Sequence, residues 1–259
     1  PGVFVYDMDG TGNQLNISTR GLDPHRGWEF NIRKDGIVTN SDMYGYPASH
    51  YNVPMEAIER IELVRGTASL QYGAQFGGML NFVSKQADTT RRFAFENIST
   101  VGSFGLLSTF NRASGKLGKW TYIAWMQRKG LDGYRDNARS DFQAQNVTIG
   151  FTPNRRLRFR AEWTRSDYVV QLPGPLNDSM FHADPRMSIR ARNYYQPDIH
   201  VPSFVVEWEP NERTAVRWAT SAVLGRRNSV LFDRTSNIVD ALDTNTLNYA
   251  VRQVDIDQF

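Results

Sequence analysis

The sequence predicts a mixed α+β N-terminal domain followed by antiparallel strands of a transmembrane β-barrel, and three observations favour this fold class. Residues 1–86 combine short apolar runs with loops rich in Gly, Asp and Pro. From about residue 92 onward, long segments alternate between apolar and polar side chains, as strands with one apolar face do. The connections between these segments alternate between short and long, which is typical of transmembrane barrels. We therefore expect one domain over residues 1–86 and the first part of a barrel over residues 92–259.

Composition narrows the possible function classes. No run approaches the ~20 consecutive apolar residues of a transmembrane helix, a requirement that alternating barrel strands do not share. Cysteine is absent, which removes disulfides, thiolate metal sites and cysteine nucleophiles. The 25 Arg and 5 Lys are scattered among 27 Asp and Glu. With a net charge of +3 and no basic block to follow a phosphate backbone, we expect no nucleic-acid partner.

The N-terminal domain is expected to contain short strands joined by turns. The expected strands are Val3–Tyr6, Leu15–Arg20, Phe30–Lys34, Ile61–Arg65 and Met79–Ser84. A helix is expected from Pro54 to about Arg60, since Pro suits a first helical turn, and a short turn is expected after Thr67. The chain starts at Pro1 without an initiator Met or leader and ends in a strand-like run at Phe259, so we expect an internal piece of a longer protein.

The barrel strands are justified by their two-residue period. In LRFRAEWTRSDY, which begins at Leu157, every second side chain is apolar as far as Trp163. SFVVEWEP and TAVRWATSAVL repeat the pattern, with tight turns expected at residues 115–119, 153–156 and 210–213. Longer loops are expected at residues 131–141, 171–200 and about 233–253. A tilted strand of ~10 residues covers a ~25 Å apolar band, so the strand length favours a barrel over a soluble β-sandwich such as a lectin.

One motif near the N-terminus suggests a different protein class. Residues 3–13, VFVYDMDGTGN, resemble the first motif of haloacid-dehalogenase-type phosphatases, in which Asp7 is the nucleophile and Asp9 the general acid/base around Mg²⁺. That class needs long helices between parallel strands, and residues 12–36 read as turns and strands instead. A calcium loop fits less well, because Gly10 is fourth rather than sixth and Ser18 occupies the position of the final Glu. We keep the phosphatase as a remote alternative.

Residues 54–85 carry the most specific signal. The run PMEAIERIELVRGTASLQYGAQFGGMLNFVSK resembles the end of the plug domain of TonB-dependent outer-membrane receptors, including its ERIE, RG, YG, GG and N-x-V-x-K elements. Upstream, NISTRG at residues 16–21 and Asp35-Gly36 stand where this family has similar elements. Within the family, DxDGTGN, RGLDP, DGI and the LPGPL run at residues 172–176 resemble ferric-citrate receptors.

The resemblance implies a plug inside a barrel of roughly 22 strands, of which this chain supplies most of the plug and about eight strands. It implies TonB-dependent import of a ferric chelate, ferric citrate or a similar siderophore, across the outer membrane of a Gram-negative bacterium. The same fold importing cobalamin, another siderophore or an oligosaccharide is the alternative. The protein is then no enzyme and needs no cofactor, because the chelate carries the iron. The implied partners are TonB, through a segment before Pro1, the chelate, and outer-membrane lipid and lipopolysaccharide.

The resemblance also implies site residues. Arg20 and Arg65 match plug arginines that pair with barrel carboxylates, whose counterparts we expect beyond Phe259. Apical plug loops would bring ligand-binding side chains from His25, Arg26, Trp28, Tyr44, Tyr46 and His50. A long outer loop would add His182, Arg186, Arg190 and Arg192, since Arg presents paired donors to carboxylates. No two of the four His have metal-ligand spacing, so we expect no metal site.

The two faces of the expected barrel strands imply different neighbours. The polar face should turn towards the lumen and the plug, with Arg158, Arg160, Glu162 and Arg217. The apolar face should turn towards lipid, with Trp163, Trp208 and Trp218 in or near an aromatic girdle.

Overall fold

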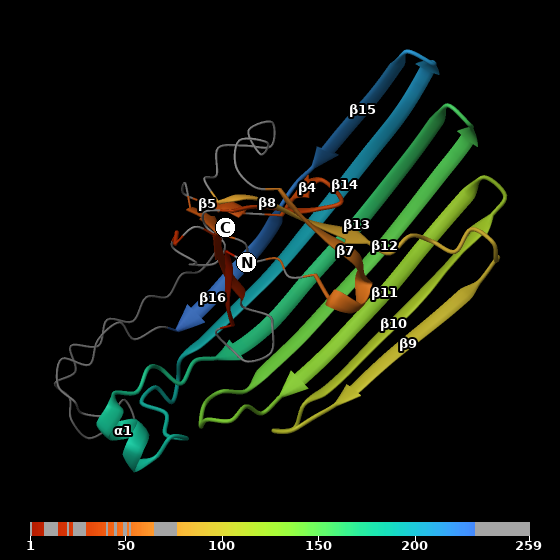
Figure 1. Cartoon of the computed structure of the whole chain (residues 1–259). Coiled ribbons are helices and arrows are strands. Elements are labelled where there is room, and N and C mark those ends of the chain that lie inside the picture. The colour runs from red at the N-terminus through yellow and green to blue at the C-terminus, as the bar shows by residue number, and fades with distance from the viewer. Residues whose placement is uncertain are drawn as a thin grey trace.

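A computed structural model describes residues 2–7, 15–19, 21–22, 30–39, 41–43, 46–48, 51, 53–64 and 77–230 (Figure 1). The described chain is mostly β-structure, arranged in one sheet of eight strands, one of four and two of two. In these residues, no helix combines the length and apolar character that a membrane crossing requires.

The eight-stranded sheet, here called the wall sheet, is an antiparallel meander. Its strands are β9 Ala94–Val101, β10 Leu107–Leu117, β11 Trp120–Leu131, β12 Ser140–Asn154, β13 Leu157–Gln171, β14 Tyr194–Asn211, β15 Thr214–Ser221 and β16 Leu224–Val230. β15 and β16 pair with successive parts of β14, so they continue one another across a break at residues 222–223. The tight turns lie at one end of the sheet and the longer loops at the other, as the alternating loop lengths predicted (Figure 1).

The N-terminal region, residues 2–84, holds the smaller sheets. β1 Val3–Asp7 pairs with β2 Leu15–Thr19, and β5 Ser41–Met43 pairs with β6 Tyr46–Ala48. The four-stranded sheet runs β4 Ile37–Val38, β3 Phe30–Lys34, β8 Gly78–Ser84 and β7 Ile58–Val64. β3 lies parallel to β8, while β4 and β7 are antiparallel to their neighbours. β1, β2, β3 and β8 match the predicted strands closely, and β7 overlaps the predicted Ile61–Arg65 but begins at Ile58; β4, β5 and β6 were not predicted.

The predicted helix from Pro54 to Arg60 is wrong over most of its length. A 3₁₀ turn, Met55–Ala57, is all that forms, and β7 begins at Ile58. Strand pairing with β8 prevails, because Ile61 and Leu63 pack opposite Phe82 and Leu80 of β8. The α-helical part of the expected α+β fold is not found in the described N-terminal residues. The described α-helix, α1 Asp178–Ala183, lies in the loop between β13 and β14.

The phosphatase alternative does not agree with the arrangement of the first strands. β1 leads into β2, its antiparallel neighbour, with Val3 opposite Thr19 and Asp7 opposite Leu15. A doubly wound fold would place a parallel strand and a crossover helix after the motif.

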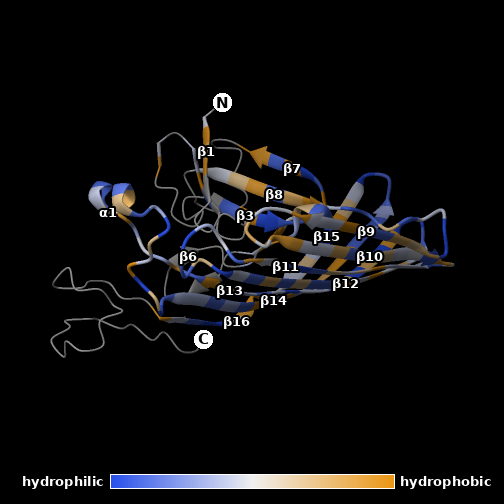
Figure 2. Ribbon diagram, turned by 90° about the horizontal axis from the view of Figure 1, so that it is seen from below, coloured by the Kyte–Doolittle hydropathy of each residue, from blue (hydrophilic) through white to orange (hydrophobic). Residues whose placement is uncertain are grey.

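The N-terminal region covers one face of the wall sheet (Figure 2). A shared apolar core joins the two parts. On the N-terminal side it contains Ile17, Ile32, Ile37, Tyr51, Val53, Leu80 and Phe82. On the wall side it contains Ile199, Val201 and Val205, which project from β14 towards the N-terminal region. Burying this apolar surface is the largest non-directional contribution to docking of the two parts.

The opposite face of the wall sheet is apolar near the tight turns. Strand register places its side chains in rows that cross the sheet. One row is Ala113, Ala124, Val147, Trp163 and Pro202; the next contains Tyr122, Ile149, Ala161 and Phe204; the third contains Trp120, Phe151, Phe159, Val206 and Trp218. Aromatic rings contact one another on this face near the tight turns. The ring centroids of Trp120 and Phe151 are 4.4 Å apart, and those of Phe204 and Trp218 are 5.9 Å apart. Trp208 and Trp218 are about half exposed, so the predicted outward orientation of these tryptophans is confirmed.

Towards the long loops, the same face becomes polar. Arg128, Gln143, Asp167, Asp198 and Arg226 follow one another in direct register across five strands. Arg165 Nε donates to Asp198 Oδ1 at 2.8 Å, and Arg165 Nη2 donates to Asp167 Oδ2 at 3.1 Å. The outward face therefore has an apolar band and a charged band, in that order from the turns.

Candidate functional site

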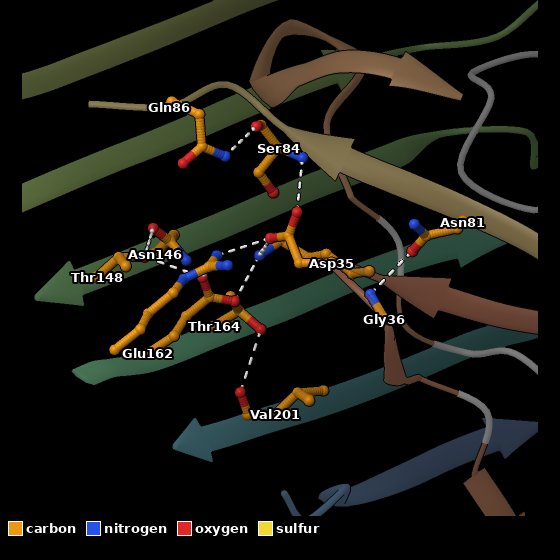
Figure 3. Close-up of polar contacts among 12 residues, drawn as sticks. Asp35, Gly36, Asn81, Ser84, Gln86, Asn146, Thr148, Glu162, Thr164 and Val201 are labelled. Carbon is orange, nitrogen blue, oxygen red and sulfur yellow. Dashed lines mark hydrogen bonds and ion pairs between the residues drawn. The ribbon is translucent and has the colours of Figure 1, made fainter. Parts of the chain in front are cut away.

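A two-residue turn brings charged groups of the N-terminal region to the wall sheet. Lys34 of β3 pairs with Ile37 of β4, and Asp35 and Gly36 form the turn between them with φ values of 51° and 78°. Positive φ at both central residues defines the hairpin turn that favours Asp-Gly. The turn is held against β8, where Ser84 N donates to Asp35 Oδ1 at 2.9 Å (Figure 3).

Beneath this turn lies a cluster of four charges, here called the four-charge cluster: Lys34 and Asp35 from the N-terminal region with Arg160 and Glu162 from β13. Lys34 Nζ donates to Glu162 Oε1 at 2.5 Å, and Arg160 Nη2 donates to Asp35 Oδ2 at 2.7 Å. Within the wall, Arg160 Nη2 also donates to Glu162 Oε2 at 2.5 Å, and Thr148 Oγ1 donates to Glu162 Oε2 at 2.9 Å. The side chains of Lys34, Asp35 and Glu162 are only 4%, 8% and 8% exposed. Each charge therefore meets an opposite charge, and three of the four side chains are largely closed to water, whereas Arg160 is 31% exposed.

The geometry suits a registering contact. Lys34, at the end of β3, and Asp35, in the turn that follows, have opposite charges and face Glu162 and Arg160, which are two residues apart on β13. A slip of two residues along β13 would therefore set like charges against each other. A buried pair adds little net stability compared with apolar residues, but losing one member leaves an uncompensated charge. The cluster should thus fix one position of the N-terminal region on the wall and resist partial displacement.

Asp35 supplies a pH-dependent prediction for this contact. Burial alone would raise the pKa of Asp35, but Lys34, Arg160 and the Ser84 N–H lower it from 3.8 to about 2. The deprotonated form then stabilises the folded protein above about pH 4, and that contribution of about 2 kcal/mol is lost as the pH falls towards 2. We expect the difference in the free energy of unfolding between the native protein and Asp35→Asn to shrink by about this amount between pH 5 and pH 2, measured by denaturant titration at each pH. A difference that stays constant across this range would contradict the ionised, paired Asp35.

A cavity of about 440 Å³ with a largely polar lining is beside the cluster, on the side of the tight turns. Its charged lining includes Arg60, Glu62, Arg158, Glu207 and Arg217. Most of these charges are paired: Arg60 with Glu62 at 2.8 Å and Arg158 with Glu207 at 3.0 Å. Arg217 Nη2 lies 3.4 Å from the carbonyl oxygen of Asp35. The predicted orientation of Arg158, Arg160, Glu162 and Arg217 towards the N-terminal region is thereby confirmed.

Four of the predicted ligand-binding residues lie in the described 172–193 loop at the other end of the wall. His182 is exposed in the last turn of α1, and Arg186 and Arg192 are also exposed, whereas Arg190 is half-buried. The carbonyl oxygens of Arg186 and Arg190 accept hydrogen bonds from the neighbouring 132–139 loop, from Asp136 N at 2.9 Å and Asn137 Nδ2 at 2.5 Å. The loop therefore offers cationic side chains from a backbone that is held in place.

The remaining predicted site residues stay predictions. Arg20, Arg65, His25, Arg26, Trp28, Tyr44 and His50 lie outside the described residues. Tyr46 lies in β6, where only the backbone is described.

Two groups of residues were missed by the sequence analysis. The first is the pairing of Lys34 and Asp35 with β13; its signal was the Asp-Gly turn together with opposite charges on the polar face of the LRFRAEWTRSDY strand. The second is Arg135 and Asn137 in the 132–139 loop, whose partners are backbone carbonyls and leave no pattern in the sequence.

Both the N-terminal region and the wall sheet fall within the residues that match known proteins. The family model of the TonB-dependent receptor plug domain matches residues 1–79. The chain is 26% identical over 177 residues to the ferric enterobactin receptor of Pseudomonas aeruginosa, covering 60% of this chain and 22% of that protein. It is 30% identical over 137 residues to the vitamin B12 transporter BtuB of Photobacterium profundum, covering 52% of this chain and 21% of that protein. The chain thus spans about a fifth of the length of these curated relatives.

Solved structures show the same fold. The ferric citrate transporter FecA in its unliganded form matches with a TM-score of 0.75 and 20% identity, covering 91% of this chain and 37% of that one. The pyoverdine outer-membrane receptor FpvA of Pseudomonas aeruginosa matches with a TM-score of 0.69 and 18% identity, covering 89% of this chain and 34% of that one. At these identities the likeness concerns the fold: a small N-terminal domain against one face of a long antiparallel sheet.

Proposed function

We propose that this chain, whose residues 1–79 match the family model of the TonB-dependent receptor plug domain, is the plug and first wall strands of a receptor that imports a ferric chelate across the outer membrane. The observation that carries the proposal is the combination of that plug with a wall sheet whose two faces differ. One face packs against the plug, and the other bears apolar rows suited to lipid. Such a receptor moves its solute without making or breaking a bond in it, so the chain is not an enzyme.

The wall sheet would continue into a closed barrel of roughly 22 strands, with its tight turns in the periplasm and its long loops outside. The apolar band would contact lipid tails. The charged band with Arg128, Arg165 and Arg226 would lie at the level of phosphorylated headgroups, including lipopolysaccharide. TonB would act from the periplasm on a segment upstream of the plug and release the plug from the wall, against the four-charge cluster.

Ferric citrate is the proposed substrate. Support comes from the DxDGTGN, RGLDP and LPGPL runs and from the Arg side chains of the 172–193 loop, which suit the carboxylates of a citrate chelate. The fold shared with FecA agrees with this choice at the level of architecture. On the plug side, His25, Arg26, Trp28, Tyr44, Tyr46 and His50 would complete the ligand site. Arg20 and Arg65 would pair with carboxylates of the later barrel strands.

A second candidate substrate is cobalamin, favoured by the relative named as a vitamin B12 transporter. Titration of the full-length receptor in detergent, followed by tryptophan fluorescence, separates the two. We expect saturable quenching by ferric citrate and none by cobalamin at equal concentration. Quenching by cobalamin alone would overturn the choice of substrate.

Loop variants sharpen this measurement. Replacing Arg186 and Arg192 together by alanine should weaken ferric-citrate binding about tenfold or more, because two charge-assisted contacts are lost. Arg128→Ala is the matched control, since Arg128 is exposed on the outward face of β11 and no described group pairs with it. If the double variant and the control weaken ferric-citrate binding equally, the 172–193 loop is not part of the binding site.

A further inference from the structure

Two loops at the long-loop end of the wall are bonded into one unit. They are the 132–139 loop between β11 and β12 and the 172–193 loop between β13 and β14. Asp136 N donates to Arg186 O at 2.9 Å, which joins the first loop to the second. Within the second loop, Leu172 N donates to Asn193 O at 3.0 Å and Ile189 N donates to Pro173 O at 3.1 Å, so its two arms are closed on each other.

Arg135 bridges both arms of the 172–193 loop. Its Nη1 donates to Gly174 O on the first arm at 2.6 Å, and its Nη2 and Nε donate to Met187 O on the second arm at 2.7 Å and 3.2 Å. In the described residues these acceptors are all backbone carbonyls, and no carboxylate pairs with Arg135. A planar guanidinium is well suited to hold two backbone segments at a fixed separation.

Asn137 makes a second tie at the base of the same loop. Its backbone is left-handed, with φ of 52°, and its side-chain amide contacts the neighbouring loop. Nδ2 lies 2.5 Å from Arg190 O, 3.2 Å from Asn193 O and 3.5 Å from Leu172 O. Here too, one side chain of the short loop reaches both arms of the long one.

Close packing accompanies these bonds. Gly174 has φ of 77°, and a Cβ at this position would lie 2.9 Å from Arg190 Cδ. The glycine of the LPGPL run therefore lets the Arg190 side chain pass over the first arm. Ser188 Oγ donates to Pro173 O at 3.3 Å on the same side.

We propose that Arg135 and Asn137 are positioning residues for ligand recognition. They hold the 172–193 loop closed before any ligand arrives, so that His182, Arg186 and Arg192 are presented from an ordered backbone. Binding of a carboxylate-rich chelate then avoids the entropy of ordering a loop of this length. This inference rests on the proposed function for its ligand, but the loop tie itself needs no ligand and is measurable without one.

The first test is hydrogen exchange of the ligand-free, full-length receptor. Arg135→Ala and Asn137→Gly should each speed the exchange of the amides of Asp136, Leu172 and Ile189 about tenfold or more, since several hydrogen bonds are lost. Glycine at 137 keeps the left-handed backbone accessible while removing the amide donors. Arg139→Ala is the matched control, because Arg139 is in the same loop but its exposed side chain pairs with Asp141 outside the tie. If these amides exchange no faster in Arg135→Ala than in Arg139→Ala, Arg135 does not hold the two loops together.

The second test is ferric-citrate binding and uptake by the same variants. The Kd should rise about tenfold in Arg135→Ala, while uptake at saturating chelate stays near the native rate. Arg135→Lys should recover part of the affinity, because an ammonium also donates to carbonyls. An unchanged Kd alongside faster exchange would contradict the positioning role. If the native receptor does not bind ferric citrate, the substrate proposal fails, and the exchange result still decides whether Arg135 and Asn137 hold the loop.

Discussion

Replacing Glu162 by alanine is expected to weaken docking of the plug on the wall by about 3 kcal/mol, because the Lys34 ammonium loses its closest partner in a buried place. The Lys34 ammonium still has the Asp35 carboxylate at 3.4 Å in this variant. The loss of docking free energy should therefore be at the lower end of the range for a broken buried ion pair. The measurement is a urea titration of the full-length receptor, followed by a fluorophore attached to the plug. In the Glu162→Ala variant the docking transition should shift to lower urea without a change in the barrel transition.

Two further variants separate charge from packing. Lys34→Met combined with Glu162→Leu should recover most of the lost stability, since an apolar pair of similar volume replaces the ion pair. Glu207 pairs with Arg158, and its side chain is 43% exposed. Glu207→Ala should therefore change the docking free energy by less than about 1 kcal/mol. If Glu207→Ala weakens docking as much as Glu162→Ala, the four-charge cluster has no special role.

Placing an arginine on the apolar band should destabilise the membrane-inserted receptor by about 2–4 kcal/mol when the site lies near the bilayer centre. Val147 is the position of choice, because it projects from β12 on the uncovered face and is 45% exposed. The free energy of insertion is measured by urea titration of folding into lipid vesicles. The expected effect has a simple cause: lipid tails offer the guanidinium neither water nor a counter-charge.

Gln145→Arg is the matched control for Val147→Arg. Gln145 lies on the same strand and face, two residues closer to the long loops, in register with Arg165 of the charged band. There the added charge should cost no more than about 1 kcal/mol. Equal costs at positions 147 and 145 would show that the apolar rows do not contact lipid.

The alternation of the wall strands made them predictable from the sequence. Leu157, Phe159, Ala161 and Trp163 share a face because strand side chains alternate with a period of two residues, and no tertiary contact is needed to read that pattern. The loops were predictable as the segments in which the alternation stops. The expected 171–200 loop is shorter than predicted, because β14 begins at Tyr194.

The plug was harder to predict. Ile58 to Arg60 reads as a continuation of a helical turn before the strand expected from Ile61. The strand begins earlier, at Ile58, because β8 offers Leu80 and Phe82 as cross-strand partners to β7. Lys34 and Asp35 pair with residues more than 120 positions away, as their hydrogen bonds to Glu162 and Arg160 show. The sequence carries the charges but not the register that brings them together. The contacts of Arg135 and Asn137 could not be predicted from the sequence, because their acceptors are backbone carbonyl groups, which every residue has.

We propose that this chain belongs to a receptor for energised import of a ferric chelate. The most direct measurement is uptake of radiolabelled iron, supplied as ferric citrate, by cells that lack other ferric-citrate receptors and express the full-length protein. We expect iron to accumulate in cells with TonB and not in otherwise identical cells without TonB. Absence of uptake in cells with TonB, or equal uptake in both strains, would contradict it.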